Sequence, residues 1–297
     1  LASRLVESIL LNVPIPPCYL SQNDEFELDV IDGQQRIYSI YRFIENQFRL
    51  SDLEVLEELN GLRFFEIGEK EQRKLSTHTL RCVVVTNDSH PEVKFDVFER
   101  LNTNTIPLNA QELRNCMYRG ALNDLLSELS EFKPWLQILR RREPDKRLRD
   151  EELILRFFAF HLYGFESYRT PQKHWLSEAA KQGRRFDDRT ISELREVWMS
   201  TVEKCLIVFE PEECFRRLPV DSKSKVVNRA LMDLLMGSMS RMSETAVKRK
   251  VKSIRRRYEM VLRDEDFQDL ISKSVDHKSR TLSRLEIWDR LFEQHVM

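Results

Sequence analysis

The chain has 297 residues, of which 33% are charged, and its formal net charge is −1 at pH 7. That length suffices for one large domain or two ordinary ones, and no apolar run approaches the roughly 18 residues that span a bilayer. The composition therefore excludes an integral membrane protein, and the charge leaves room for a nucleic-acid surface only as a local patch. The first ten residues have a helical period and internal charges, unlike a secretory signal peptide, and a cytoplasmic protein is the simplest interpretation.

The five cysteines are widely spaced, odd in number and never arranged as Cys-x-x-Cys. This spacing argues against a disulfide framework and against a structural zinc site. We interpret them as reduced, mostly buried thiols.

Short runs rich in β-branched and aromatic residues predict a small sheet early in the chain. They lie at 16–20, 26–31 and 79–85, with 62–65 as a further candidate. Helices are predicted at 35–49, 69–77 and 91–101. A further helix is opened by Asn109, where Glu112 completes a capping-box spacing.

After about residue 125 the strand signals nearly vanish, and apolar residues recur at helical spacing. The helices predicted there cover 150–163, 188–209, 224–240 and 243–262. The predicted fold class is therefore α+β, with a small mixed sheet and its helices in 1–125 and a mainly α-helical domain in 126–297.

A strand, a tight turn and a helix are predicted in succession at 26–48, and the turn carries Asp32-Gly33-Gln34-Gln35-Arg36. The first turn of a helix presents unpaired backbone N–H groups and the positive end of the macrodipole, so it binds anions, and a glycine lets the backbone approach them closely. The guanidinium of Arg36 suits a phosphate, and the amides of Gln34 and Gln35 can bind sugar, base or phosphate. The sequence therefore indicates a phosphate site at this turn.

The alternative is a plain helix start, in which Asp32 is the N-cap and the next residues form a solvated first turn. By pattern alone both interpretations have equal weight, because Asp and Gly are common at helix starts. An arginine in the first turn opposes the macrodipole by roughly several tenths of a kcal/mol, which a bound anion would offset. This argument favours the anion site.

A second polar motif lies at 98–108 and leads into the helix opened by Asn109. It brings amides, a carboxylate and arginines to a junction between two helices, where they could complete a ligand site from the opposite side. The alternative is a connector whose asparagines adopt turn geometry. This motif alone does not separate the two interpretations.

Together these features resemble the N-terminal domain family of GmrSD restriction endonucleases, which is marked by the DGQQR motif at 32–36. The other residues that carry the resemblance are the helix at 5–10 with the following Pro14-Ile15-Pro16, and the run at 98–115 with its Glu112-x-Arg114-Asn115. The resemblance covers about residues 1–120 and is weaker beyond them.

The resemblance implies a ParB/sulfiredoxin-like fold, whose relatives bind nucleoside triphosphates at a Gly-x-x-Arg turn that Gly33 and Arg36 match. In the ParB branch a glutamate and asparagine run contributes to nucleotide and metal handling, and Glu99, Asn102 and Asn104 match it loosely. The implied cofactor is a nucleoside triphosphate, with GTP, CTP and ATP left open, together with Mg²⁺.

The candidate residues of this site fall into two groups. Those expected to bind the nucleotide are Gly33, Gln34, Arg36, Arg100, Asn102 and Asn104. Those expected to take part in hydrolysis, by binding a metal ion or by activating or orienting water, are Asp32, Gln35 and Glu99.

Members of this family act in defence against phage or modified DNA, where the domain is an NTP-dependent switch and a separate HNH-type domain usually cuts. The resemblance therefore implies DNA and a nuclease domain or subunit as partners. The chain departs from the family pattern in two places. Nothing corresponds to the family's first strand, so we expect an upstream segment to be missing, and the histidines are scattered singly, without the spacing of an HNH nuclease.

The predicted helix at 243–262 is densely basic, which indicates contact with nucleic-acid phosphates. The residues expected to make that contact are Lys248, Lys250, Lys252, Arg255 and Arg256, and Arg249 and Arg257 belong to the same run. The alternative, of equal weight, is a solvated helix balanced by Asp264, Glu265 and Asp266 just downstream.

Three functions are compatible with these features. The first, favoured by the resemblance, is an NTP-binding and NTP-hydrolysing module of a DNA-targeting restriction or anti-phage system. The second is a DNA-binding or scaffold module, in which the same turn grips a DNA phosphate and no nucleotide is consumed. The third is a ParB-like nuclease that acts alone.

Overall fold

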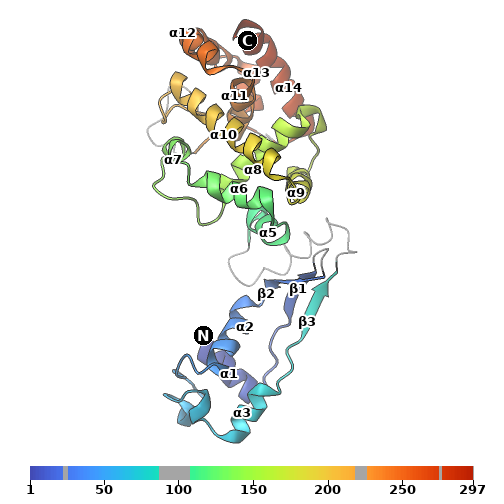
Figure 1. The fold of residues 1–297 in the computed structure, drawn as a ribbon, viewed down its shortest axis with the longest axis vertical. Coiled ribbons are helices and arrows are strands. Elements are labelled where there is room, and N and C mark those ends of the chain that lie inside the picture. Colours follow the sequence, from blue (N-terminus) through green and yellow to red (C-terminus); the bar gives the residue numbers. More distant parts are fainter. Residues whose placement is uncertain (23–25, 87–107, 218–225, 274–275, 297) are drawn as a thin grey trace. The chain divides into compact units, whose positions relative to one another are not determined.

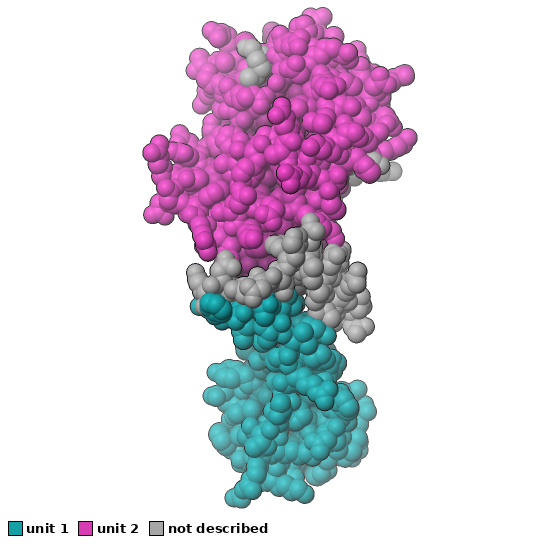
Figure 2. Space-filling model, turned by 90° about the vertical axis from the view of Figure 1, so that its right-hand side faces the viewer, with its two compact units in different colours: residues 1–108 teal, residues 109–297 magenta. Residues whose placement is uncertain are grey.

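The computed structural model describes residues 1–297 except 23–25, 87–107, 218–225, 274–275 and 297 (Figure 1). The chain divides into two compact units, Leu1–Leu108 and Asn109–Met297, which Figure 2 shows in different colours. The first unit contains the sheet, and the described part of the second is built of helices. This confirms the predicted α+β class with a mainly helical C-terminal region. The domain boundary predicted at residue 125 stays a prediction, because it refers to domains that fold independently, whereas the two units are defined by compactness.

The sheet of the first unit has three strands in the order β2-β1-β3. β1 (Cys18–Gln22) pairs antiparallel with β2 (Leu28–Asp32), with Tyr19 opposite Asp32, and parallel with β3 (Cys82–Val85), with Cys18 opposite Cys82. The end of β2 and the beginnings of β1 and β3 therefore lie at the same end of the sheet. The three principal predicted strands are all present, although each begins slightly later than expected.

Beside the sheet, three helices and two 3₁₀ turns of the first unit enclose a small apolar core (Figure 1). The helices are α1 (Ala2–Leu10), α2 (Gln34–Ile44) and α3 (Glu69–Ser76), and the turns are η1 (Glu57–Leu59) and η2 (Phe64–Glu66). The further strand predicted at 62–65 is wrong, because Phe64 is buried in this core and the N–H of Glu66 donates to the carbonyl of Arg63 at 2.9 Å, which closes a 3₁₀ turn. The helix predicted at 91–101 lies outside the described residues.

The second unit begins with the predicted capping box. The side chain of Asn109 accepts hydrogen bonds from the backbone of Gln111 and Glu112, and the carboxylate of Glu112 accepts one from the N–H of Asn109. The helices that follow are α5 (Ala110–Met117), α6 (Ala121–Ser130), α7 (Lys133–Leu139), α8 (Arg149–Tyr163), α9 (Gln172–Gly183), α10 (Asp188–Val208), α11 (Arg229–Arg241), α12 (Glu244–Val261), α13 (Glu265–Leu270) and α14 (Lys278–Trp288), with the 3₁₀ turn η4 (Phe165–Ser167), the π-helical segment η5 (Asp289–Glu293) and the short helix α15 (Gln294–Val296). The four long helices predicted after residue 125 are thus present as α8, α10, α11 and α12. None of the described helices is long and apolar enough to cross a membrane.

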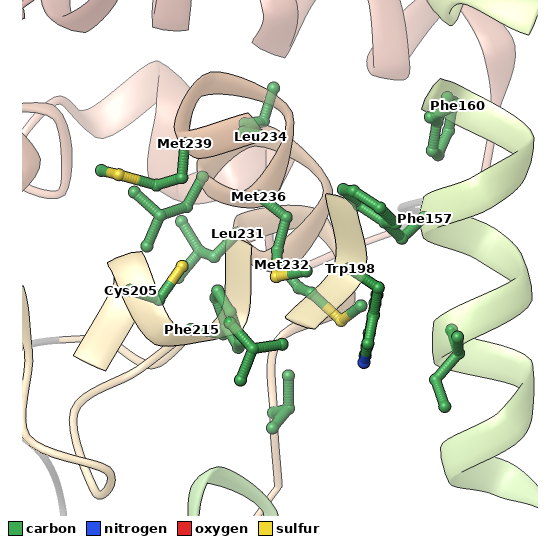
Figure 3. Close-up of a cluster of buried hydrophobic side chains, with 14 of the residues drawn as sticks. Phe157, Phe160, Trp198, Cys205, Phe215, Leu231, Met232, Leu234, Met236 and Met239 are labelled. Atoms are coloured by element: carbon green, nitrogen blue, oxygen red, sulfur yellow. The ribbon is translucent and has the colours of Figure 1, made fainter. Parts of the chain in front are cut away.

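The core of the second unit is centred on α11, which is apolar around most of its circumference. Figure 3 shows Met232 and Met236 of this helix packed among Trp198 and Cys205 of α10 and Phe157 of α8. The ring centroids of Phe157 and Trp198 lie 5.2 Å apart in an edge-to-face arrangement. A helix that is apolar nearly all round is stable only when other helices surround it, which explains why the bundle forms here.

Candidate functional site

The turn between β2 and α2 is built on Gly33. This residue has a φ of 97°, in the left-handed region, and it is buried. A Cβ at this position would lie 2.6 Å from the Sγ of Cys18 in β1, closer than real Cβ contacts. Both the backbone conformation and the contact with β1 therefore require a glycine.

Gly33 is also the N-cap of α2, so the interpretation of Asp32 as the N-cap is wrong. No side chain caps the helix, and the intrahelical bonding begins with the N–H of Ile37, which donates to the carbonyl of Gly33 at 2.9 Å. The earlier N–H groups of the first turn have no partner within the helix. The start of α2 therefore has the backbone donors and the positive dipole end that an anion requires.

Arg36 points back from the first turn of α2 to the ends of two strands. Its Nη2 donates to Oδ2 of Asp32 at 2.5 Å and to the carbonyl of Pro17 at 3.4 Å. Its side chain is 20% exposed, and its Nε is buried without a hydrogen-bond partner among the described residues. The carboxylate of Asp32 already offsets the charge of Arg36, so the position of this arginine in the first turn does not require an external anion.

The amide side chains of Gln34 and Gln35 are exposed at the start of α2. The same helix exposes Tyr38 and Tyr41, each by about half, whereas Phe43 is fully buried. Phe43 instead points toward the core of the first unit. The polar side chains of the turn are therefore accessible to a ligand.

The thiol of Cys18 lies against the turn, because its Sγ faces Gly33. Burial raises the pKa of its thiol, and the nearby guanidinium of Arg36 only partly opposes that effect. The thiol is therefore protonated at neutral pH and is unsuited to nucleophilic catalysis. All five cysteines are free, and Cys18, Cys205 and Cys214 are buried, as the sequence predicted for most of them.

A cavity of about 370 Å³ lies at the same end of the sheet. It is lined by the segment before β1, 12–16, and by the segment before β3, 78–81. The N–H of Cys18 donates to the carbonyl of Arg81 at 2.8 Å and joins these two segments. The lining combines apolar side chains with Asn12, His78 and Arg81, a mixture found in small-molecule sites.

Part of the second polar motif has a structural role. Arg114 is buried in α5, where Nη1 donates to Glu152 of α8 and to Gln111 at 3.0 Å each. Glu112 forms an ion pair with Arg147 at 2.9 Å besides closing the capping box. These side chains hold α5 against α8, so they are not available to a ligand. Glu99, Arg100, Asn102 and Asn104 lie outside the described residues.

The described residues contain no group of three or more His, Cys, Asp or Glu side chains placed to hold a metal ion. At the turn itself, Asp32 supplies a carboxylate, and its side chain is 35% exposed. A Mg²⁺ ion that reached the turn would therefore need ligands from phosphate oxygens and water besides Asp32, which is how this ion is usually held beside nucleotides.

The predicted nucleic-acid residues of α12 separate into two groups. Arg255 donates to Glu213 at 2.8 Å, Lys250 donates to the carbonyl of Val296 at 2.6 Å, and Lys248 forms an ion pair with Glu244. Lys252 and Arg256 are exposed and have no ion-pair partner among the described residues. The structure therefore leaves only part of this basic helix available to a partner.

Residues 2–119 match the family described as GmrSD restriction endonuclease, N-terminal domain. The matched segment takes in the whole strand, turn and helix around Gly33 and continues to the end of α5. Comparisons with curated proteins and with solved structures gave no match. The match therefore supports the resemblance to GmrSD restriction endonuclease N-terminal domains over residues 2–119.

Proposed function

We propose that the chain is a nucleoside-triphosphate-binding module of a DNA-targeting restriction system, and that the turn from Gly33 to Arg36 holds the triphosphate. The restriction role rests on the family of residues 2–119. The nucleotide role rests above all on the donors of the turn: α2 begins without a capping side chain, and the Nε of Arg36 is buried there with no partner among the described residues. Phosphate oxygens are acceptors that fit both kinds of donor.

The pair between Asp32 and Arg36 supports a particular form of the ligand. A bare phosphate that approached Arg36 would be repelled by the carboxylate of Asp32, which lies 2.5 Å from the guanidinium. A triphosphate that carries Mg²⁺ would not, because the cation offsets the charge of the carboxylate. We therefore propose a magnesium nucleotide rather than inorganic phosphate as the ligand.

The other candidates take part around this turn. Gln34 is placed to bind the ligand, and Gln35 to orient it or a water molecule. In hydrolysis Asp32 and Glu99 are the carboxylates that could bind the metal ion or activate water, and the cavity lined by 12–16 and 78–81 is our candidate site for the base. Cutting of DNA is assigned to a separate nuclease domain or subunit.

The proposal is tested by calorimetric titration of the full chain with ATP, CTP and GTP in the presence of Mg²⁺. Arg36→Ala should weaken the binding of the preferred nucleotide by about tenfold or more, because a charge-assisted hydrogen bond contributes roughly 1.5–3 kcal/mol. The matched control is Arg42→Ala in the last turn of the same helix, which should bind as the native chain does. Equal affinity of the native chain and Arg36→Ala, with both folded by circular dichroism, would remove the site from this turn.

The two alternative functions give different results with the same proteins. A DNA-binding or scaffold module would bind none of the three nucleotides but would lose DNA affinity in Arg36→Ala. A ParB-like nuclease that acts alone would cleave DNA when supplied with Mg²⁺ only. Either result would replace the proposed function.

A further inference from the structure

Helix α12 has one face in the core and a different, basic face toward solvent. Val247, Ile254, Tyr258 and Val261 are buried, at the spacing of a single helical face. Arg249, Lys252 and Arg256 are exposed, and they follow one another at intervals of three and four residues, which places them on one line of the helix surface. We call these three residues the α12 stripe.

The α12 stripe is the part of the basic helix that the protein itself does not use. Lys250 and Arg255 are held by Val296 and Glu213, but no ion pair or hydrogen bond links the side chains of the stripe to another described residue. Three positive charges so close together repel one another, and they lower the stability of the helix unless an anion binds.

The acidic residues downstream do not balance the stripe. Asp264 is the N-cap of α13, where its side chain accepts a hydrogen bond from the N–H of Phe267 at 2.9 Å. Glu265 and Asp266 lie in the first turn of α13, where the macrodipole favours negative charge. None of the ion pairs between described residues joins 264–266 to α12. The structure therefore does not support the alternative interpretation, in which these acidic residues balance the charge of the basic helix.

We propose that the α12 stripe binds the phosphate backbone of double-stranded DNA. From Arg249 to Arg256 the helix advances by roughly 10 Å, and one DNA strand presents a phosphate about every 3.4 Å of duplex axis, so the stripe can reach about three phosphates. An anionic membrane is the less suitable partner, because a helix that binds a membrane surface inserts its apolar face, and the apolar face of α12 is buried in the protein. Contacts of this kind position a duplex without reading its sequence.

This binding surface is independent of the proposed nucleotide site. It lies on the second unit, beyond the residues that match the family, and it takes a polymer rather than a mononucleotide. In a system that targets DNA, the α12 stripe would hold the duplex at any base sequence.

The test is fluorescence anisotropy of a labelled 30-base-pair duplex with the full chain, over a series of salt concentrations. The test variant carries Arg249→Gln, Lys252→Gln and Arg256→Gln. The control variant carries Lys133→Gln, Lys181→Gln and Arg189→Gln, which remove the same charge from exposed positions of α7, α9 and α10. Glutamine keeps the helix propensity high, and thermal unfolding checks that both variants are folded.

The test variant should bind the duplex at least tenfold more weakly at about 100 mM salt, and its slope of log affinity against log salt should be smaller by about three, one for each lost phosphate contact. The control variant should keep the native slope, and Arg36→Ala should bind the duplex like the native chain. Native slope and affinity in the test variant would overturn the proposal. Two further results would also overturn the proposal. One is that the native chain does not bind DNA at low salt. The other is that the native chain binds vesicles of phosphatidylserine and phosphatidylcholine, and that the test variant loses this vesicle binding but binds DNA like the native chain.

Discussion

At the scale of single residues, the turn depends on two contacts, that of Gly33 with Cys18 and that of Arg36 with Asp32. That a glycine and an arginine matter there follows from the sequence, because the strand, turn and helix pattern is local. The contact of Gly33 with Cys18 and the pair of Arg36 with Asp32 depend on how β1 packs beside β2, which no local pattern encodes. The pair with Asp32 supplies an internal anion for the arginine.

Gly33→Ala should destabilise the chain by at least about 1–2 kcal/mol, because alanine in the left-handed region has that cost before any clash is counted. The clash with the Sγ of Cys18 adds to it. In the background of Cys18→Ala the same substitution should therefore cost less. Urea unfolding of the four proteins measures both values, and an equal cost in the two backgrounds would show that the contact with Cys18 does not matter.

At the scale of elements, the long helices were predictable and their partners were not. The apolar periodicity of the sequence predicted α8, α10, α11 and α12, and the capping-box motif predicted the start of α5. Each of these patterns lies within a single segment of the chain. The roles of Arg114 and Glu112 could not be predicted, because their partners Glu152 and Arg147 are 38 and 35 residues away in the chain. The described part of this polar motif therefore proved to be a structural anchor of α5.

The pair of Arg156 in α8 and Asp233 in α11 joins two central helices of the second unit. Both side chains are at most 2% exposed, and two guanidinium nitrogens donate to the carboxylate at 2.6 Å. Asp233→Ala should cost about 3–5 kcal/mol of the free energy of unfolding, because it leaves the charge of Arg156 buried, with Asp276 as its one remaining ion-pair partner among the described residues. The double variant Arg156→Met, Asp233→Leu should be clearly more stable than Asp233→Ala. Urea unfolding followed by tryptophan fluorescence compares them, and a double variant no more stable than the single one would refute this account of the pair.

At the scale of the whole molecule, the net charge of −1 does not show how unevenly the charged side chains are distributed. The sequence identified the basic helix, but it could not separate the cations that pair with Glu213 or Val296 from those of the α12 stripe, because those partners belong to other elements. The sequence also could not show that Asp264, Glu265 and Asp266 stabilise the start of α13. The predicted mixture of a small sheet and a helical C-terminal region was, by contrast, accessible from composition and period.

Glu151 gives the stability of the whole chain a pH dependence. Burial, with the charge of Asp150 second, raises the pKa of Glu151 from 4.5 to about 7. The folded chain therefore binds more protons than the unfolded chain between these pH values, so this residue's contribution to the free energy of unfolding is complete below pH 4.5 and is lost as the pH rises through 7. Glu151→Gln cannot titrate, so its free energy of unfolding should rise relative to that of the native chain as the pH increases from 5 to 7.5. The exposed Glu203→Gln serves as the control, and parallel pH profiles of the native chain and Glu151→Gln would contradict the assignment.

We propose that the start of α2 binds a nucleotide through its phosphates. The most direct measurement is a crystal structure of the full chain with Mg²⁺ and a non-hydrolysable analogue of the nucleotide that calorimetry selects. We predict phosphate oxygens within hydrogen-bond distance of the backbone N–H groups of Gln34 to Arg36 and of the guanidinium of Arg36. A nucleotide bound elsewhere, with the Asp32–Arg36 pair unchanged and no phosphate at the turn, would contradict it.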